Sequence, residues 1–377
     1  MTMETYRISS KLKERDREYL IQTTNDSSSG RVVTDVYVDG LRTESVACPH
    51  PEDINPQEVL SLVKVTHGEK KKELETLLQA YSQVVERGDP EIIYQLATAF
   101  FYKRFYREAS ELFDSVLMIM PKHHQAANYL GMSLMSQGLL DRALDAAKTA
   151  VELRPSFADY RNNLGEVYLA AQNPAPAIEQ LERAITINMY YSDAYFNLAL
   201  AYGLKARADD DHQLRSQAIG KMVESLNKAS MIDTDLRDQP DFKTGFQALQ
   251  TADFSRAVSS FLAVREARRE SRRQQFSTYY MRFLLHPGWV TERAVMERIE
   301  FLEDSIRDNP TYVDLQAELG ECYLEHARLV WEKGVRQLKK ASDMNPALTR
   351  ISEAYEHSQT LLGELNKTVS GITEKKQ

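Results

Sequence analysis

The sequence predicts a mainly α-helical protein: an α-solenoid of helix pairs, about seven units long, behind a small antiparallel β/helix module. Two observations carry this prediction. From about residue 90 onward, apolar and small residues recur every 34 positions, and a fixed period of this length is typical of repeat proteins. Residues 5–48 are instead rich in β-branched and aromatic residues, as strands are. The expected domains are residues 1–88, a solenoid over 89–346, a capping helix over 347–366 and a flexible tail over 367–377.

The first 50 residues predict three or four antiparallel strands. Tyr19–Thr24 runs into the turn cluster Asn25–Gly30, and the strand Arg31–Val38 follows it. Asp39-Gly40 then gives the two-residue signal of a type I′ hairpin. Residues 6–12 are the candidate for the fourth strand. Because two hairpins cannot bury enough surface alone, a helical partner is expected.

Two helices are predicted to follow the strands. Asn55-Pro56-Gln57-Glu58 offers an N-cap, a proline at the first helical position and the glutamate that completes a capping box. A second helix, Glu69–Arg87, carries apolar residues at helical spacing and stops at Gly88-Asp89-Pro90. We expect this second helix to cap the N-terminal end of the solenoid.

Each set of positions that recurs every 34 residues, called a column here, has a physical reason for its residue type. Leucines four residues from a second large apolar residue give the first helix of each pair one apolar face. Alanines three or four residues apart give the second helix a stripe of small side chains, so the two helices can approach closely. Prolines then break the chain between pairs. The clearest columns are Leu96, Leu130, Leu164 and Leu198; Phe100, Leu134, Tyr168 and Tyr202; Ala109, Ala143 and Ala177; and Pro121 and Pro155.

The register continues less cleanly after residue 202. About eleven extra residues fall within Lys205–Gln217, and a fifth unit follows around Gly245 and Phe261. A sixth unit is divergent, with aromatic residues between 276 and 283, a turn at 286–288 and Pro310 at its end. A seventh unit, from Leu319-Gly320 to Pro346, is predicted as two helices, and the helix over 348–366 covers the last apolar face.

These columns resemble the tetratricopeptide repeat (TPR) family, whose pattern places Leu-Gly, Tyr, Ala-x3-Phe and Pro within 34 residues. The resemblance implies a TPR-like α-solenoid over about residues 90–346, and residues 1–88 resemble no family that we recognise. The family's tryptophan column is not kept, since Ile93, Ala127, Arg161 and Tyr195 occupy it. The resemblance also implies a concave groove built from the first helix of each pair. Its groove-facing columns correspond to Tyr94, Thr98, Phe101, Tyr102, Asn128, Met132, Met135, Asn162, Glu166, Leu169, Phe196 and Leu200.

The groove columns also indicate the kind of partner. Apolar and amide groups dominate them, which suits an extended peptide or a helix laid in the groove. The TPR subclass that clamps a carboxylate uses Lys and Arg in these columns, and none is present here, so that partner is disfavoured. Asn163 and Asn197 share another column and resemble two rungs of the asparagine ladder of some TPR grooves; the alternative is that both only satisfy backbone groups.

Composition and charge exclude several classes. Of the 377 residues, 42% are hydrophobic and 27% charged, as in ordinary globular proteins. The net charge of −8 makes a nucleic-acid partner unlikely. Two cysteines, Cys48 and Cys322, indicate a reducing compartment. With no signal-like N-terminus and no apolar run of about 18 residues, no transmembrane segment is expected and the expected location is cytoplasmic.

Motifs for catalysis are missing from the sequence. Gly220-Lys221 lacks the upstream glycine that a phosphate-binding loop needs, and neither His-Glu-x-x-His nor Cys-x-x-Cys occurs. His123 and His124 are adjacent, so on a helix they would point about 100° apart and could not share a metal. We therefore expect no enzyme activity, no cofactor and no metal site.

A stripe of arginines is the second candidate surface. Its steps of three, one, three and one residues lay five guanidiniums along one side of a helix, where they could receive phosphates, anionic lipid or an acidic peptide. The alternative is a solvated face paired with Glu266, Glu270 or acidic neighbours. The stripe consists of Arg265, Arg268, Arg269, Arg272 and Arg273.

The sequence thus predicts a non-catalytic intracellular scaffold or adaptor that binds a partner protein or peptide in the concave groove. Two other functions stay open. The arginine stripe could make the protein a binder of anionic polymers or membrane surfaces, which raised salt would release. The N-terminal module could instead drive homo-oligomeric assembly through an exposed strand edge.

Overall fold

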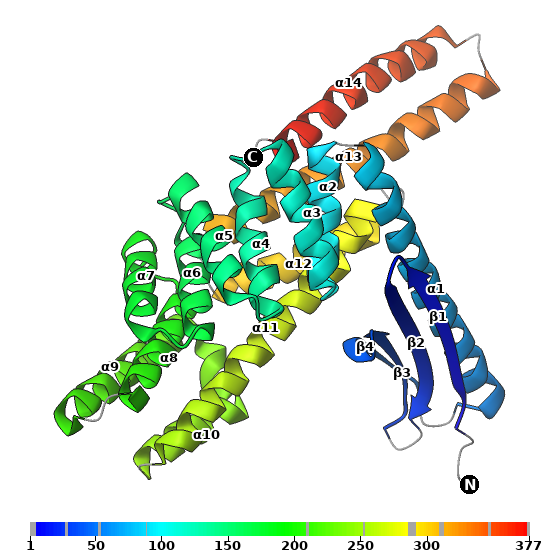
Figure 1. Cartoon of the computed structure of the whole chain (residues 1–377). Helices are drawn as coiled ribbons and strands as arrows, with labels where there is room; N and C mark the ends of the chain where they lie inside the picture. The colour runs from blue at the N-terminus through cyan, green and yellow to red at the C-terminus, as the bar shows by residue number, and fades with distance from the viewer. Residues whose placement is uncertain are drawn as a thin grey trace. The chain divides into compact units, whose positions relative to one another are not determined.

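The predicted fold class is confirmed: the chain is mainly helical and begins with a four-stranded antiparallel sheet (Figure 1). The structure is a computed structural model, and it describes the chain except residues 1–4, 27–28, 52–53, 88, 209–210, 252, 286–291, 309–312, 346–347 and 375–377. The side chains of residues 83–87 and some side chains within the last third of the chain lie outside this description as well. The chain divides into two compact units, Met1–Leu153 and Arg154–Gln377. The division expected after residue 88 is a different one and stays a prediction.

The sheet consists of β1 (Arg7–Glu14), β2 (Arg17–Asp26), β3 (Arg31–Val38) and β4 (Leu41–Pro49), paired in chain order. The candidate strand over 6–12 is therefore confirmed. At the β3–β4 turn, Asp39 and Gly40 have φ angles of 50° and 84°. Positive φ at both central residues is the requirement of a type I′ turn, which explains the Asp-Gly pair.

One long helix, α1 (Pro56–Arg87), covers a face of the sheet (Figure 1). The predicted capping box is present, because the Glu58 amide donates to Asn55 Oδ1 at 2.9 Å and the Asn55 amide donates to Glu58 Oε2 at 3.3 Å. Val59 and Val63 pack on Val32 of β3.

The prediction of two separate helices in this region is wrong. The helix runs without a break through Gly68, where a glycine costs about 1 kcal/mol relative to alanine. The preceding residue explains why it continues: His67 is buried against the sheet, with its ring nitrogens 2.8 Å from Ser10 Oγ and 3.0 Å from Thr23 Oγ1. These tertiary contacts outweigh the local propensity.

Two helix pairs complete the first unit: α2 (Pro90–Tyr102) with α3 (Tyr106–Ile119), and α4 (His124–Ser136) with α5 (Leu140–Leu153). The close approach predicted for the small residues is confirmed. A Cβ added to Gly131 would lie 3.2 Å from Ala147 Cβ and 3.2 Å from the Ala143 carbonyl oxygen. The small residues on both helices therefore set the distance within the pair.

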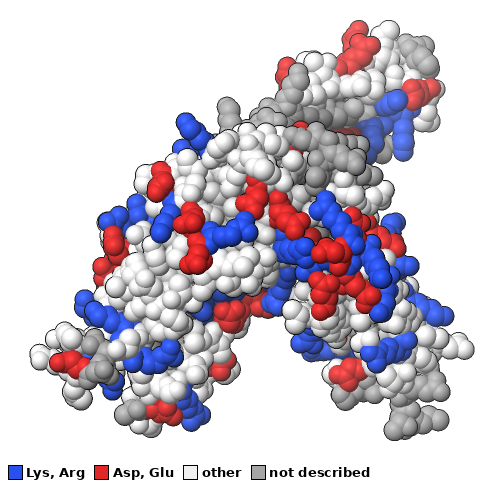
Figure 2. All heavy atoms as spheres, viewed as in Figure 1, with Lys and Arg blue, Asp and Glu red and all other residues white. Residues whose placement is uncertain are grey.

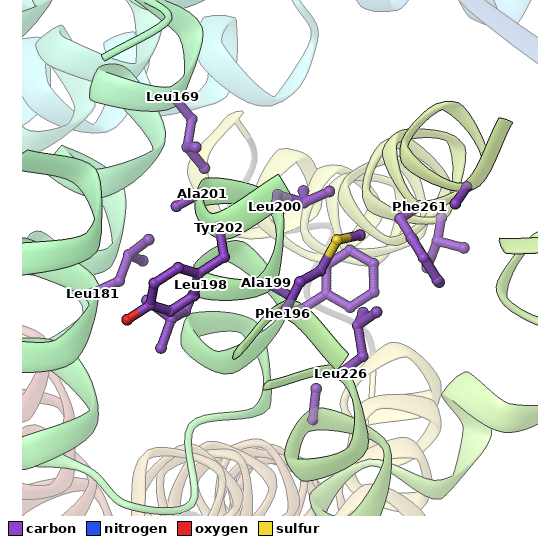
Figure 3. Close-up of a cluster of buried hydrophobic side chains, with 14 of the residues drawn as sticks. Leu169, Leu181, Phe196, Leu198, Ala199, Leu200, Ala201, Tyr202, Leu226 and Phe261 are labelled. Atoms are coloured by element: carbon purple, nitrogen blue, oxygen red, sulfur yellow. The ribbon is translucent and has the colours of Figure 1, made fainter. Parts of the chain in front are cut away.

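The second unit continues with three more pairs: α6 (Ala158–Ala170) with α7 (Pro174–Ile187), α8 (Ser192–Ala208) with α9 (His212–Ile232), and, after the short helix η1 (Thr234–Asp238), α10 (Pro240–Gln250) with α11 (Phe254–Leu285). The extra residues within 205–217 lengthen α8 and α9 to 17 and 21 residues. Helix α8 is buried on opposite sides: Tyr202 and Leu198 lie toward Leu181 of α7, and Phe196 lies toward Phe261 of α11 (Figure 3).

The last part of the chain departs from the predicted pairs. It consists of α12 (Glu292–Asp308), α13 (Val313–Met344) and α14 (Thr349–Glu374). The seventh unit was predicted as two helices and is a single helix of 32 residues, α13. Leu319 packs on Val295, Ile299 and Leu302 of α12, but among the described atoms none lies within 4 Å of a Cβ placed at Gly320. The glycine of this Leu-Gly pair therefore does not make the close helix contact that Gly131 makes in a repeat.

The capping helix and the aromatic segment of the sixth unit also differ from the prediction. The capping helix is longer than predicted, since α14 extends past residue 366 to Glu374. The backbone of the predicted aromatic segment 276–283 belongs to α11, which continues without a break to Leu285. The side chains of that segment, the turn at 286–288, Pro310 and Pro346 lie outside the described residues.

Candidate functional site

The predicted groove residues lie on α2, α4, α6 and α8, the first helix of each of four pairs. They fall into two surfaces, one in each unit. The α2–α4 surface consists of Tyr94, Phe101, Met132 and Met135, which are half-buried, beside the buried Thr98, Tyr102 and Asn128. The α6–α8 surface consists of Asn162, Glu166, Leu169, Phe196 and Leu200, all of them buried, together with Asn197.

Aromatic rings hold the α2–α4 surface together. Phe101 meets Tyr129 edge-on at a centroid distance of 5.2 Å, and the hydroxyls of Tyr102 and Tyr129 are hydrogen-bonded at 2.9 Å. Tyr94 lies 4.7 Å from the ring of His123, the residue that caps α4. The central residue, Tyr129, was not among the predicted groove residues. It occupies the same 34-residue column as Asn163 and Asn197, and this shared column is the signal that could have found it.

A hydrogen-bonded network of side chains organises the α6–α8 surface. The Asn197 amide donates to Asn162 Oδ1 at 2.9 Å and to Glu166 Oε1 at 2.8 Å. Asn197, predicted as a rung of an asparagine ladder, is thus bonded to other side chains. Burial raises the pKa of the Glu166 carboxyl, but Arg269 and Arg265 beside it outweigh this effect and hold that pKa below its usual value. Glu166 is therefore a buried carboxylate that stays charged.

The arginine stripe supplies the positive charges of this network. Arg269 is bonded to Glu166, whereas Arg268 bridges Asp193 of α8, at 2.7 Å, and Asp233 at the end of α9. Arg273 is paired with Glu270 on its own helix.

The other two members of the stripe are Arg265 and Arg272. Arg265 lies 3.7 Å from Glu266, and burial lowers the pKa of its guanidinium. The side chain of Arg272 lies outside the described residues. Anion binding by the stripe stays a prediction, and an incoming anion would compete with the chain's own carboxylates. No local sequence pattern could have predicted the contact between Glu166 and Arg269, because the two residues lie 103 positions apart.

A polar junction joins the sheet, α1 and the first helix pair inside the first unit. Lys103 Nζ lies 3.0 Å from Glu44 and 2.5 Å from Glu73, and Lys70 contacts the same two carboxylates at 3.1 and 2.9 Å. Burial raises the pKa of Glu44, but the two lysines outweigh it and lower that pKa overall. These charged groups are therefore half-buried or buried as a balanced cluster of two lysines and two glutamates.

Beside this junction, Glu108 of α3 is buried and accepts hydrogen bonds from Arg17 and Tyr19 of β2, both at 2.5 Å. A cavity of about 190 Å³ lies next to it, lined mainly by charged residues and two tyrosines. In the part of the chain that the structure describes, no three potential metal ligands gather, and no helix has the length and apolarity needed to cross a bilayer.

Comparison with known families agrees with the helix pairs. The tetratricopeptide repeat family model matches residues 94–156 and 130–192, which are α2 to α7. Residues 94–192 are tetratricopeptide repeats. This array was predicted from the spacing of the leucine, alanine and proline columns, and that prediction is confirmed over these residues.

Several solved structures are similar to the chain. A MamA protein is 24% identical, over 46% of this chain and 91% of that one, with a TM-score of 0.37. MamA from Desulfovibrio magneticus RS-1 is 22% identical, over 46% and 95%, with a TM-score of 0.35. A thermophilic TPR protein of Thermus thermophilus is 17% identical, over 63% and 100%, with a TM-score of 0.35. No curated protein matches the sequence.

Proposed function

We propose that this chain is a non-catalytic scaffold that binds a segment of a partner protein on the α2–α4 surface. One observation carries the proposal. Of the predicted groove residues, only Tyr94, Phe101, Met132 and Met135 are half-buried among the described side chains, and the others are buried. Aromatic and methionine side chains with part of their area in water are the usual anchors of helix and peptide binding.

The rigidity of this surface supports the same proposal. Phe101 is fixed by edge-on contacts with Tyr102, Tyr106 and Tyr129 at 5.2–5.7 Å. A preformed surface loses little conformational entropy when a partner binds, so more of the contact energy goes into affinity. Methionines beside it adapt to the partner's shape because their side chains are unbranched and flexible.

The test compares capture of proteins from a native lysate by three full-length baits. The Phe101→Ala/Met132→Ala double variant is expected to lose proteins that the wild-type chain retains through high salt. Met118→Ala is the matched control, because Met118 is 76% exposed at the end of α3 and lies off the α2–α4 surface. Thermal unfolding of each bait checks that the array is intact. Equal retention by the double variant and the wild type would contradict the proposal.

The structure gives less support to an anionic-polymer or membrane-surface binder. At least three guanidiniums of the stripe are paired with carboxylates of the chain, and basic and acidic side chains are interspersed on the face shown in Figure 2. In the lysate experiment, nucleic acid or lipid that salt releases would indicate this function instead.

The edge strand β4 favours a second candidate, self-association. Leu41 and Val46 of β4 are 76% and 40% exposed, and an open strand edge can pair with another copy. In that case light scattering would give a mass that rises above the 43.2 kDa of one chain with concentration, and Val46→Lys would abolish the rise.

A further inference from the structure

Helix α11 lies on the α6–α8 surface, where the TPR resemblance places a partner. Phe261 of α11 meets Phe196 of α8 edge-on at a centroid distance of 6.3 Å, and both side chains belong to the cluster in Figure 3. Two turns further along α11, Arg269 is bonded to Glu166 of α6. A helix of this chain therefore occupies the part of the groove in which the predicted groove residues are buried.

The acceptor for this arginine is built by α6 and α8 alone. The Asn197 amide donates to Glu166 Oε1 and to Asn162, so these three side chains orient one another without help from α11. Glu166 Oε2 then remains for Arg269. A buried carboxylate needs a charged donor, because a neutral side chain would leave its charge uncompensated. The surface is thus shaped to receive a cation at one fixed point.

The two halves of α11 are held in different ways. Ala257, Phe261 and Val264 are buried in the hydrophobic core of the second unit. Beyond Val264, no described side chain of α11 is buried, and the ion pairs of Arg268 and Arg269 join this half to α6, α8 and the end of α9. These ion pairs are largely buried, so the desolvation of both charges offsets much of their attraction. A partner's arginine that replaces Arg269 would also keep the charge of Glu166 compensated. The second half of α11 can therefore be displaced while the first half stays in place.

The geometry points to the α6–α8 surface as a receptor for an arginine carried by an amphipathic partner helix, with Arg269 of α11 as the internal occupant that the partner replaces. This inference rests on the proposed function, which is partner binding in the groove. It adds a second binding position, the α6–α8 surface, and the residue type that binds there, an arginine. Until the partner binds, α11 keeps the charge of Glu166 compensated.

A peptide made from α11 tests the inference. The probe is a fluorescein-labelled synthetic peptide with the sequence of residues 265–273, titrated into the full-length chain and followed by fluorescence anisotropy. The Arg268→Gln/Arg269→Gln chain, whose internal occupant is removed, is expected to bind the peptide at least tenfold more tightly than the wild type. A peptide with glutamine in place of Arg269 is expected to lose that gain.

The receptor side has its own variant and matched control. Adding Glu166→Gln to the Arg268→Gln/Arg269→Gln chain is expected to weaken peptide binding at least tenfold. Glu179→Gln is the control, because Glu179 is a half-exposed glutamate of α7 that pairs with Arg183 outside the α6–α8 surface. Equal binding by the wild-type and double-variant chains, or binding that Glu166→Gln leaves unchanged, would overturn the inference.

A second measurement covers the case in which the double variant does not fold. Hydrogen–deuterium exchange of residues 265–273 is expected to be faster in the Glu166→Gln chain than in the wild type, while exchange of residues 254–264 stays the same. Unchanged exchange in both segments would contradict a displaceable half of α11. The outcome is distinguishable from failure of the proposed function, whose test uses Phe101 and Met132 in the other unit.

Discussion

Glu108 of α3 is a buried carboxylate that links the N-terminal module to the first helix pair. Both of its bonded partners, Arg17 and Tyr19, come from β2. Glu108→Ala is expected to lower the free energy of unfolding by about 3–5 kcal/mol, because it leaves the Arg17 guanidinium largely buried without this partner. Urea unfolding followed by circular dichroism measures the loss.

Two further variants separate the ion pair from simple surface effects. The Arg17→Met/Glu108→Leu pair removes both charges together and is expected to recover part of the loss, since no charge then stays buried alone. Lys11→Ala breaks the exposed Lys11–Glu18 pair of the same sheet and is expected to change stability very little. A double variant that is less stable than Glu108→Ala would contradict this account.

His123 makes the first unit sensitive to acid. It caps α4 by accepting a hydrogen bond from the Ala126 amide at Nδ1, at 3.1 Å, which requires a neutral ring. Burial lowers the pKa of His123 below the usual value of 6.5. Between the folded pKa and about 6.5 the unfolded chain binds more protons, so stability is lost as the pH falls below about 6.5. His67, whose pKa burial also lowers, adds to the same loss.

The histidine prediction is checked with urea midpoints at about pH 7.5 and about pH 5.5. His123→Asn keeps an N-capping oxygen but cannot titrate, so its midpoint is expected to fall less on acidification than that of the wild type. His357→Asn, on the exposed side of α14, is the control and should keep the wild-type dependence. An identical fall for all three chains would show that His123 does not contribute.

Within each helix pair, the recurring small residues allow the two helices to pack closely. A Cβ added to Gly165 would lie 2.7 Å from Leu181 Cγ, so Gly165→Ala forces α6 away from α7. We expect it to destabilise the second unit by about 1–3 kcal/mol, as overpacking of a close contact does. Gly320→Ala is the matched control: that position is open, and alanine is expected to be neutral or to stabilise α13 by up to about 1 kcal/mol.

Differential scanning calorimetry of the two glycine variants provides the measurement. Opposite signs of the change in midpoint would support the view that Gly165 belongs to a repeat and that Gly320 only resembles one. Destabilisation of similar size at both positions would contradict it. Circular dichroism at low temperature should show the same helix content in both variants.

The fold could be predicted from the sequence where it depends on local, repeated contacts, and not where it depends on contacts between distant segments. Columns spaced by 34 residues predicted the helices from α2 to α8, because each pair repeats the same local contacts. The local sequence pattern gave a wrong prediction at α1 and at α13: in each region two helices were predicted, and the structure has one continuous helix. In α1 the decision comes from His67 bonding to strands more than forty residues earlier, and a local window contains no sign of that contact.

The candidate site shows the same limit. Tyr94, Phe101, Met132 and Met135 followed from the columns of the TPR resemblance and lie half-buried on their helices. The arginine stripe was recognised from its spacing, but its partners could not be, because Glu166, Asp193 and Asp233 lie far from it in the sequence. A charged pair between distant segments leaves no periodic signal in either of them.

At the scale of the whole molecule, the N-terminal module belongs to the same compact unit as the first two repeats. Solenoids need their terminal repeats covered, because each repeat contacts only its neighbours. In the first unit, Tyr19 of β2 packs edge-on against Phe105 at 5.7 Å, and Tyr81 of α1 packs against Phe100 at 5.4 Å. The module therefore covers the outer apolar side of the first pair.

This arrangement predicts how fragments of the chain behave. Residues 1–153, expressed alone, are expected to fold with both strand and helix signals in circular dichroism and to unfold cooperatively in urea, because the unit holds its own core. Residues 89–153, which lack the module, are expected to unfold at a lower urea concentration, since Phe100 and Phe105 lose the rings that bury them and Lys103 loses Glu44 and Glu73. Equal midpoints for the two fragments would mean that the module does not stabilise the repeats. A Glu108→Ala version of residues 1–153 should fall between them, because it removes one contact of the module and keeps the aromatic ones.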